Sequence, residues 1–276
     1  MKFIILTDPH FVPPGELLFG LDPKAHLARA VEVINRDHPE IAFVVLLGDL
    51  TNRGEVAAYA SLSETLGLLN APLIPLTGNH DSRVALCEAL PQASRDSSGF
   101  MQALQVFDAA SILTLDTLDE GGGTGAGFLC PDRLAFLETA LAEASADRPL
   151  LVFQHHPPFD TGLKTMDRIK LRNPEDEWAI FERTRRPDYL FMGHVHRPIS
   201  GSWRGIPFHI QRGVSHQVGF DFANTDGITG SYEGPDYALV EVGSEGVVIH
   251  QRPFLFIGPH FMLNDAAARQ ATRRLE

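Results

Sequence analysis

The sequence predicts a layered α/β fold (α+β layered) in which two β-sheets pack against each other. Short, uninterrupted apolar runs such as residues 41–47 are typical of strands that are covered on both faces. These runs alternate with helical stripes of apolar residues as far as the run at 189–192. After Gly201 only strand patterns follow, and they resemble antiparallel strands.

The expected elements follow from these patterns in chain order. Strands are expected at 2–7, 41–47, 72–77, 150–154, 189–192, 206–211, 237–242 and 247–252. Asp22 reads as an N-cap followed by Pro23 at the first helical position, so the first helix begins there. Further helices are expected at 59–69, 83–90, from Pro131 onward, and around 176–183. The glycine-rich stretch at 121–127 is expected to be a flexible loop.

Composition limits the class of protein. The 276 residues are 44% hydrophobic and 21% charged, which is ordinary for a soluble globular protein. Without an internal repeat or an evident linker, we expect one domain over 1–276, with 263–276 as a terminal helix or tail. The formal net charge of -12 argues against a nucleic-acid polymer as partner. It leaves room for a small phosphorylated substrate, because a local site can be positive.

Cysteine usage and apolar segments indicate the compartment. Cys87 and Cys130 permit one disulfide at most, and we expect two small hydrophobic side chains in a reducing environment. The apolar run at the N-terminus is too short for a signal peptide. No apolar stretch approaches the ~20 residues of a membrane span, so we expect a cytoplasmic protein without a membrane partner.

Polar clusters follow five of the predicted strands. The clusters are Asp8-Pro9-His10, Gly48-Asp49, Gly78-Asn79-His80-Asp81, His155-His156 and Gly193-His194-Val195-His196. The carboxyl ends of strands in α/β sheets are where ligands bind. A lone histidine is usually a core residue, but five such clusters at equivalent positions predict a functional site.

Aspartate, asparagine and imidazole donors suit Mn, Fe, Co or Zn. The ligands are too many for one tetrahedral ion, so we expect two divalent metal ions bridged by one carboxylate. A hydroxide between two such ions attacks phosphorus near neutral pH, and a histidine that binds no metal stabilises the leaving oxygen. The clusters therefore predict hydrolysis of a phosphoester.

The same blocks resemble the calcineurin-like metallophosphoesterase family, in family order from residue 8 to residue 196. The resemblance implies a four-layer metallophosphoesterase β-sandwich of two mixed sheets flanked by helices. It also implies two metal sites. One metal would be held by Asp8, His10 and His196, the second by Asn79, His155 and His194, and Asp49 would bridge both.

The resemblance also implies catalytic roles. His80 would be the catalytic histidine that binds no metal, beside the phosphate together with Asn79, and Asp81 would orient it. Either His155 or His156 could serve as the ligand after its strand. We favour His155, which follows the strand directly, and expect His156 to pack in the turn.

Within the family, the chain resembles the bacterial class III cyclic nucleotide phosphodiesterases and glycerophosphodiesterases. Phosphoprotein phosphatases typically carry Gly-Asn-His-Glu in the third block, where this chain has Asp81. The resemblance makes His216, Gln217 and Asn173 candidate substrate contacts, although Asn173 could equally be a turn residue and His216 a strand-end hydrogen-bonding residue. Phe19, in a loop over the site, either stacks on a base or packs against the protein.

The leading hypothesis is a dinuclear-metal phosphodiesterase for 3',5'-cyclic nucleotides or glycerophosphodiesters. The alternative is a phosphomonoesterase or dinucleoside-polyphosphate hydrolase that uses the same site. A non-catalytic scaffold is a third hypothesis. Members of this branch are often dimers or larger, so a homo-oligomer is expected. The apolar stretch at 253–263 could be an interface or core.

Overall fold

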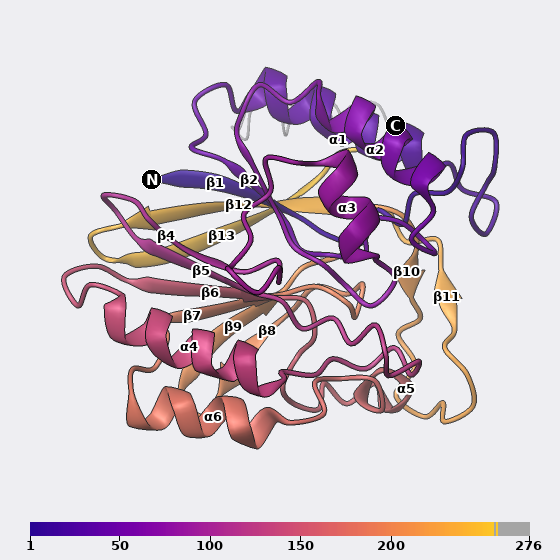
Figure 1. The fold of residues 1–276 in the computed structure, drawn as a ribbon. Helices are drawn as coiled ribbons and strands as arrows, with labels where there is room; N and C mark the ends of the chain where they lie inside the picture. The colour runs from indigo at the N-terminus through magenta and orange to yellow at the C-terminus, as the bar shows by residue number, and fades with distance from the viewer. Residues whose placement is uncertain (257, 259–276) are drawn as a thin grey trace, which may run out of the picture.

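The computed structural model describes residues 1–256 and 258, and Figure 1 shows their arrangement. The helices are α1 (Pro23–Asp37), α2 (Val56–Leu66), α3 (Arg83–Ala89), α4 (Pro131–Glu143), α5 (Lys164–Asp167) and α6 (Pro174–Arg183). The expected tail at 263–276 and part of the 253–263 stretch lie outside the described residues. Among those described, no helix is both long and apolar enough to cross a membrane.

The first sheet has the strand order β13-β12-β1-β2-β3. Its strands are β1 (Lys2–Leu6), β2 (Val44–Leu46), β3 (Leu73–Pro75), β12 (Asp236–Gly243) and β13 (Gly246–Pro253). β1, β2 and β3 run parallel, whereas β12 is antiparallel to both β1 and β13. This sheet is therefore mixed, and the carboxyl ends of its parallel strands share one edge.

The second sheet has the order β4-β5-β6-β7-β9-β8. Its strands are β4 (Ala103–Val106), β5 (Ser111–Leu115), β6 (Leu150–Gln154), β7 (Tyr189–Met192), β8 (Ile199–Trp203) and β9 (Ile206–Ile210). The four inner strands run parallel, and β4 and β8 are antiparallel edges. The short strands β10 (Gln217–Val218) and β11 (Gly230–Ser231) pair beside these sheets.

The two sheets lie against each other with helices on their outer faces, which makes four layers (Figure 1). Three apolar clusters hold these layers together. In β1, Phe3 and Ile5 face the second sheet, whereas Ile4 and Leu6 face α1 and α2. The second sheet packs in the same way against the first sheet on one face and against α4 and α6 on the other. Because both faces of these strands are buried, they carry the continuous apolar runs that predict the layered fold, and the prediction is confirmed.

Two helix starts also agree with the sequence. The Asp22 side chain accepts a hydrogen bond from the Ala25 amide at 3.0 Å, and Pro23 opens α1 as expected. α4 begins at Pro131. Both cysteines are free and half-buried.

Several elements were not predicted. The expectations omit β4, β5 and β8, which carry serine, threonine, glutamine or glycine within their runs and therefore lack a continuous apolar pattern. The expectation of antiparallel strands after Gly201 holds for one side of β9 only, because β9 pairs antiparallel with β8 but parallel with β7. It holds for β12 and β13.

Candidate metal centre

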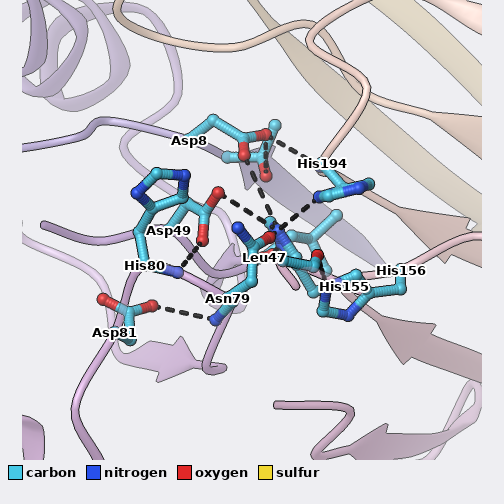
Figure 2. Close-up of polar contacts among 12 residues, drawn as sticks. Asp8, Leu47, Asp49, Asn79, His80, Asp81, His155, His156 and His194 are labelled. Atoms are coloured by element: carbon cyan, nitrogen blue, oxygen red, sulfur yellow. Dashed lines mark hydrogen bonds and ion pairs between the residues drawn. The ribbon is translucent and has the colours of Figure 1, made fainter. Parts of the chain in front are cut away.

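The polar clusters after β1, β2, β3, β6 and β7 meet at one place, where the carboxyl ends of the two sheets face each other (Figure 2). Sharp turns bring the side chains inward directly after the strands. Asp8, Asp49 and His194 have positive φ values of 52°, 50° and 68°. Such values are uncommon for residues other than glycine and cluster at functional sites.

Two glycines of these clusters stand where a side chain would not fit. A Cβ at Gly78 would lie 2.2 Å from the Asp49 carboxylate, and one at Gly193 would lie 2.2 Å from the Thr7 hydroxyl. The glycine before Asn79 and the glycine before His194 are therefore required by the close approach of neighbouring turns.

One group of donors consists of Asp8, His10, Asp49 and His196, whose ligand atoms all lie within 4.8 Å of one another. The Nε2 atoms of His10 and His196 are 3.1 Å apart. His196 Nε2 is 3.3 Å from Asp8 Oδ1, and His10 Nε2 is 3.5 Å from Asp49 Oδ2. Four donors that converge on one point, all buried, fit a divalent cation.

A second group lies on the other side of Asp49. His155 Nε2 is 3.3 Å from Asp49 Oδ2, and His194 Nδ1 is 2.9 Å from Asn79 Oδ1. Metal–ligand bonds of about 2.0–2.2 Å place neighbouring ligands at about this separation. Asp49 Oδ2 thus lies between the two groups, which is where a bridging carboxylate belongs.

The histidine pair after β6 divides into two roles. His155 Nδ1 donates to the Leu47 carbonyl at 2.6 Å, so Nε2 is the nitrogen left to face a metal ion, and it has no hydrogen-bond partner among the described residues. His156 has partners on both nitrogens, Thr117 Oγ1 at 2.7 Å and the Gly125 carbonyl at 3.2 Å. This geometry favours His155 as the ligand, with His156 packed beside it.

Asp8 and Asp49 are each oriented by hydrogen bonds to one carboxylate oxygen. Asp8 Oδ2 accepts from the Thr7 hydroxyl at 2.7 Å and from the His194 amide at 3.2 Å, while its Oδ1 is buried without a hydrogen-bond partner in the described structure. Asp49 Oδ1 accepts from the His80 amide at 2.8 Å. Buried oxygens without a donor are costly unless a cation compensates them.

The titration behaviour of the cluster agrees with a cation site. Burial raises the pKa of Asp8, but His196 and His155 outweigh it and lower the value to about 2. Burial lowers the pKa of His155, but Asp49 and Asp8 reverse the effect and raise it to about 9. Because His155 holds a proton against these carboxylates, a cation that binds there displaces that proton.

His80 lies at the edge of the cluster and is exposed. Its Nδ1 donates to the Asn52 carbonyl at 2.7 Å, which leaves Nε2 as its reactive nitrogen. Its ring is 4.8 Å from that of His10, so it borders the predicted metals without joining either donor group.

The expectation that Asp81 orients His80 is wrong, because the Asn52 carbonyl does so. The Asp81 carboxylate instead accepts from the amides of Leu50, Thr51 and Gly78 and from the Tyr59 hydroxyl, at 2.7–3.2 Å. It therefore ties the turn that carries Asp49 to the turn that carries Asn79. The tyrosine reads in the sequence only as part of an apolar helical stripe, so its polar role was missed.

A cavity of about 390 Å³ opens beside the donors. His216 and Gln217, the candidate substrate contacts from the sequence, both line this cavity. The Gln217 side chain is fully buried, donates through Nε2 to the Gly213 carbonyl at 2.7 Å, and leaves Oε1 without a partner among the described residues. The His216 carbonyl accepts a hydrogen bond from His196 Nδ1 at 2.7 Å, so His216 also orients the predicted metal ligand His196.

The hydrogen bonds of Asn173 favour its alternative role as a turn residue over a substrate contact. Asn173 does not line the cavity; its side chain exchanges hydrogen bonds with the Leu129 backbone at 3.1 and 2.9 Å and contacts Asp176 at the start of α6. It is a turn residue that fixes the segment before α4 to α6.

Known proteins resemble this chain over most of its length. A protein of Rhodopseudomonas palustris named probable cyclic nucleotide phosphodiesterase is 59% identical over 268 residues, covering 97% of this chain and 98% of that protein. The glycerophosphodiester phosphodiesterase of Enterobacter lignolyticus is 31% identical over 227 residues, covering 80% of each. The crystal structure of a dimetal phosphatase from Danio rerio shares the fold, with a TM-score of 0.68 at 14% identity over 92% of this chain and 96% of that one.

The family described as calcineurin-like phosphoesterase matches residues 1–198. That span contains every residue of the two donor groups, together with His80. The strand-end clusters, the two mixed sheets and the relatives agree, and the chain is an enzyme that belongs to the calcineurin-like phosphoesterase family.

Proposed function

We propose that the protein hydrolyses small phosphodiesters with two divalent metal ions. The observation that carries the proposal is the position of Asp49 Oδ2, 3.5 Å from His10 Nε2 in one donor group and 3.3 Å from His155 Nε2 in the other. One carboxylate oxygen between two sets of buried imidazoles is the arrangement that a pair of bridged cations requires.

The residues of this chain would hold Mn, Fe, Zn or Co, because the donors are imidazole, carboxylate and amide oxygen without a thiolate. Asp8, His10 and His196 would bind one ion, Asn79, His155 and His194 the other, and Asp49 both. When bound, such a pair supplies a nucleophile from water near neutral pH and neutralises charge on the phosphate oxygens.

His80 would act as the general acid for the leaving oxygen. Its Nδ1 is committed to the Asn52 carbonyl, so the proton that it transfers lies on Nε2, on the side of the cavity. A proton given to the leaving oxygen removes the cost of expelling an alkoxide. Asn79 and His216 border the same space and would contact the phosphate or its ester arm.

A small diester suits the cavity, whose volume of about 390 Å³ is within the range of small-molecule sites. We place 3',5'-cyclic nucleotides first, because the relative with that name is 59% identical along nearly the whole chain. Glycerophosphodiesters come second, on the relative that is 31% identical. A single domain over 1–276, cytoplasmic localisation and a homo-oligomer remain predictions from the sequence.

The proposal is tested by kcat/KM of Mn-reconstituted protein on an aryl phosphodiester and on the matching aryl phosphomonoester, with metal content measured in the same sample. We expect two metal ions per chain and a clear preference for the diester. Preference for the monoester would move the protein to the phosphatase alternative. Hydrolysis of neither substrate with both metals bound would refute the proposed activity and favour the scaffold.

A further inference from the structure

The loop before α1 places an aromatic ring at the mouth of the cavity. Leu18 and Leu21 exchange two backbone hydrogen bonds of 2.9 Å, which close a tight turn with Phe19 and Gly20 at its tip. Both tip residues have positive φ, 51° and 79°. Such a turn favours asparagine or glycine and disfavours a bulky side chain. Since the Phe19 side chain is 63% exposed, core packing does not explain its presence.

Backbone strain in this protein coincides with the site. Seven residues other than glycine have positive φ in the described part of the chain. Five of them are the predicted ligands Asp8, His10, Asp49, His194 and His196. Arg204 lies in the turn between β8 and β9, and Phe19 is the remaining one. Phe19 lines the same cavity as the ligands, which indicates that its position serves the site.

A second loop, residues 219–234, holds Phe19 in place. The Tyr232 hydroxyl donates to the Phe19 carbonyl at 3.0 Å, although Tyr232 is 75% exposed. The Phe19 ring meets the His216 ring edge-on, with centroids 4.9 Å apart at 71°. The loop before α1 and the strand β11 therefore lie side by side at the rim of the cavity (Figure 1).

Most of the cavity wall away from the metal centre is apolar, with Thr229 and Ser231 as its polar residues. Phe19, Ile228 and Tyr232, which we call the aromatic wall, line it from the two loops, and Met166 and Ile169 add further apolar surface. No lysine or arginine lines the cavity in the described part of the chain. The wall therefore offers no partner for a second charged group, whereas flat ring faces stack well on aromatic side chains.

We propose that the aromatic wall determines specificity, by favouring diesters whose ester arm carries a flat, uncharged ring system such as a nucleobase. The inference rests on the proposed function and deepens it. The ring would lie against Phe19, which lines the cavity together with the predicted ligands, while the phosphate reaches the metal centre. Diesters of small polyols have no group that uses this wall.

The test compares kcat/KM of wild type and Phe19→Ala on 3',5'-cyclic AMP and on glycerophosphoethanolamine, a diester without a ring. We expect kcat/KM for cyclic AMP to fall roughly tenfold in Phe19→Ala, as for other base–aromatic contacts, and kcat/KM for glycerophosphoethanolamine to change by less than about twofold.

Tyr232→Phe keeps the ring and removes the hydrogen bond to Phe19. We expect it to lower kcat/KM for cyclic AMP by a smaller factor and to leave that for glycerophosphoethanolamine unchanged. Phe220→Ala is the matched control, because Phe220 is an exposed phenylalanine of the 219–234 loop that does not line the cavity. Equal effects of Phe19→Ala on both substrates, or none on either, would overturn the proposal.

Binding measurements test the role of the aromatic wall independently of the proposed hydrolytic activity. Titration calorimetry on the metal-loaded protein gives the Kd of adenosine monophosphate and of inorganic phosphate. Phe19→Ala should weaken adenosine monophosphate roughly tenfold and leave phosphate unchanged. If the wild type hydrolyses no diester, the proposed function fails while this comparison still decides the role of the wall. Parallel loss of both ligands would refute that role.

Discussion

The two sides of the cavity are built in different ways. On the metal side, every donor follows a strand of the core, and Asp8 and Asp49 are 0% and 2% exposed. On the other side, the aromatic wall stands on two loops, and Phe19 and Tyr232 are 63% and 75% exposed. The sheets fix the metal side. The two loops of the wall are joined by the hydrogen bond from the exposed Tyr232 hydroxyl to the Phe19 carbonyl.

This difference assigns separate tasks to the two sides. Positions after buried strands hold ligands to within a narrow range, as a pair of metal ions requires. Loops with exposed side chains tolerate change, because few core contacts depend on them. Reaction type should therefore depend on the strand ends, and substrate choice on the loops. Substitutions on each side of the cavity test this division of tasks.

The largest effect is expected at Asp49. Asp49→Ala removes the carboxylate that lies 3.5 Å from His10 in one donor group and 3.3 Å from His155 in the other, so at least one metal ion should be lost. We expect kcat/KM to fall by at least ~10³, since bound metal ions contribute several kcal/mol to such reactions. Metal content and kcat/KM are measured together, with Asp147→Asn, an exposed aspartate, as control. Full activity with two metals retained would refute the bridging role.

His80 should separate proton transfer from metal binding. His80→Ala removes the imidazole whose Nδ1 the Asn52 carbonyl holds, but no member of either donor group. We expect kcat to fall by at least ~10² while both metal ions stay bound. His250→Ala, an exposed histidine on β13, is the control. Loss of a metal ion from His80→Ala would instead make His80 a ligand.

A buried carboxylic acid on α6 should make stability depend on pH. Glu177 of α6 is fully buried, neither carboxylate oxygen has a partner in the described structure, and burial raises its pKa to about 8. The folded protein therefore keeps a proton that the unfolded chain releases above its ordinary pKa of 4.5. The contribution of Glu177 to the free energy of unfolding, taken as the difference between wild type and Glu177→Gln, should fall as pH rises from about 4.5 to about 8, by roughly 1 kcal/mol per pH unit.

Urea unfolding of the protein in a chelator, at several pH values, measures this dependence. Glu177→Gln cannot ionise, so its free energy of unfolding should lose that slope and exceed the wild-type value at pH 8. Glu182→Gln changes an exposed glutamate of the same helix and should keep the wild-type slope. An unchanged slope in Glu177→Gln would show that another group titrates.

The convergence of the strand-end clusters could be predicted from the sequence, because each cluster is visible in a short local pattern. Asp8, Asn79 and His155 each stand directly after an apolar run, within short blocks that need no knowledge of distant contacts. The layered fold followed from the same runs. The hydrogen-bond partners that orient the site residues could not be predicted. They are backbone carbonyls, such as that of Asn52, or residues on other elements, such as Tyr59.

The differences between expectation and structure have the same origin. Asn173 was a candidate substrate contact because its surroundings in sequence resemble the family, but its partner Leu129 lies 44 residues away. The strands β4 and β5 gain their stability from pairing with each other and with β6, not from an apolar pattern of their own. Phe19 was left between stacking and packing, because its positive φ and its hydrogen bond to Tyr232 appear only in three dimensions.

The smallest expected effect is the change in stability on replacing Phe19 of the aromatic wall, and it tests whether this residue supports the fold. Phe19→Asn replaces a bulky residue at φ 51° with one that adopts this conformation readily. Because the ring is 63% exposed, little packing is lost, and we expect the free energy of unfolding to rise by about 0.5 kcal/mol. Urea unfolding measures this change, and loss of more than about 1 kcal/mol would mean that the ring supports the fold. A stability gain together with a loss of selectivity for ring-bearing diesters would show that Phe19 is kept for its substrate at the expense of the turn that carries it.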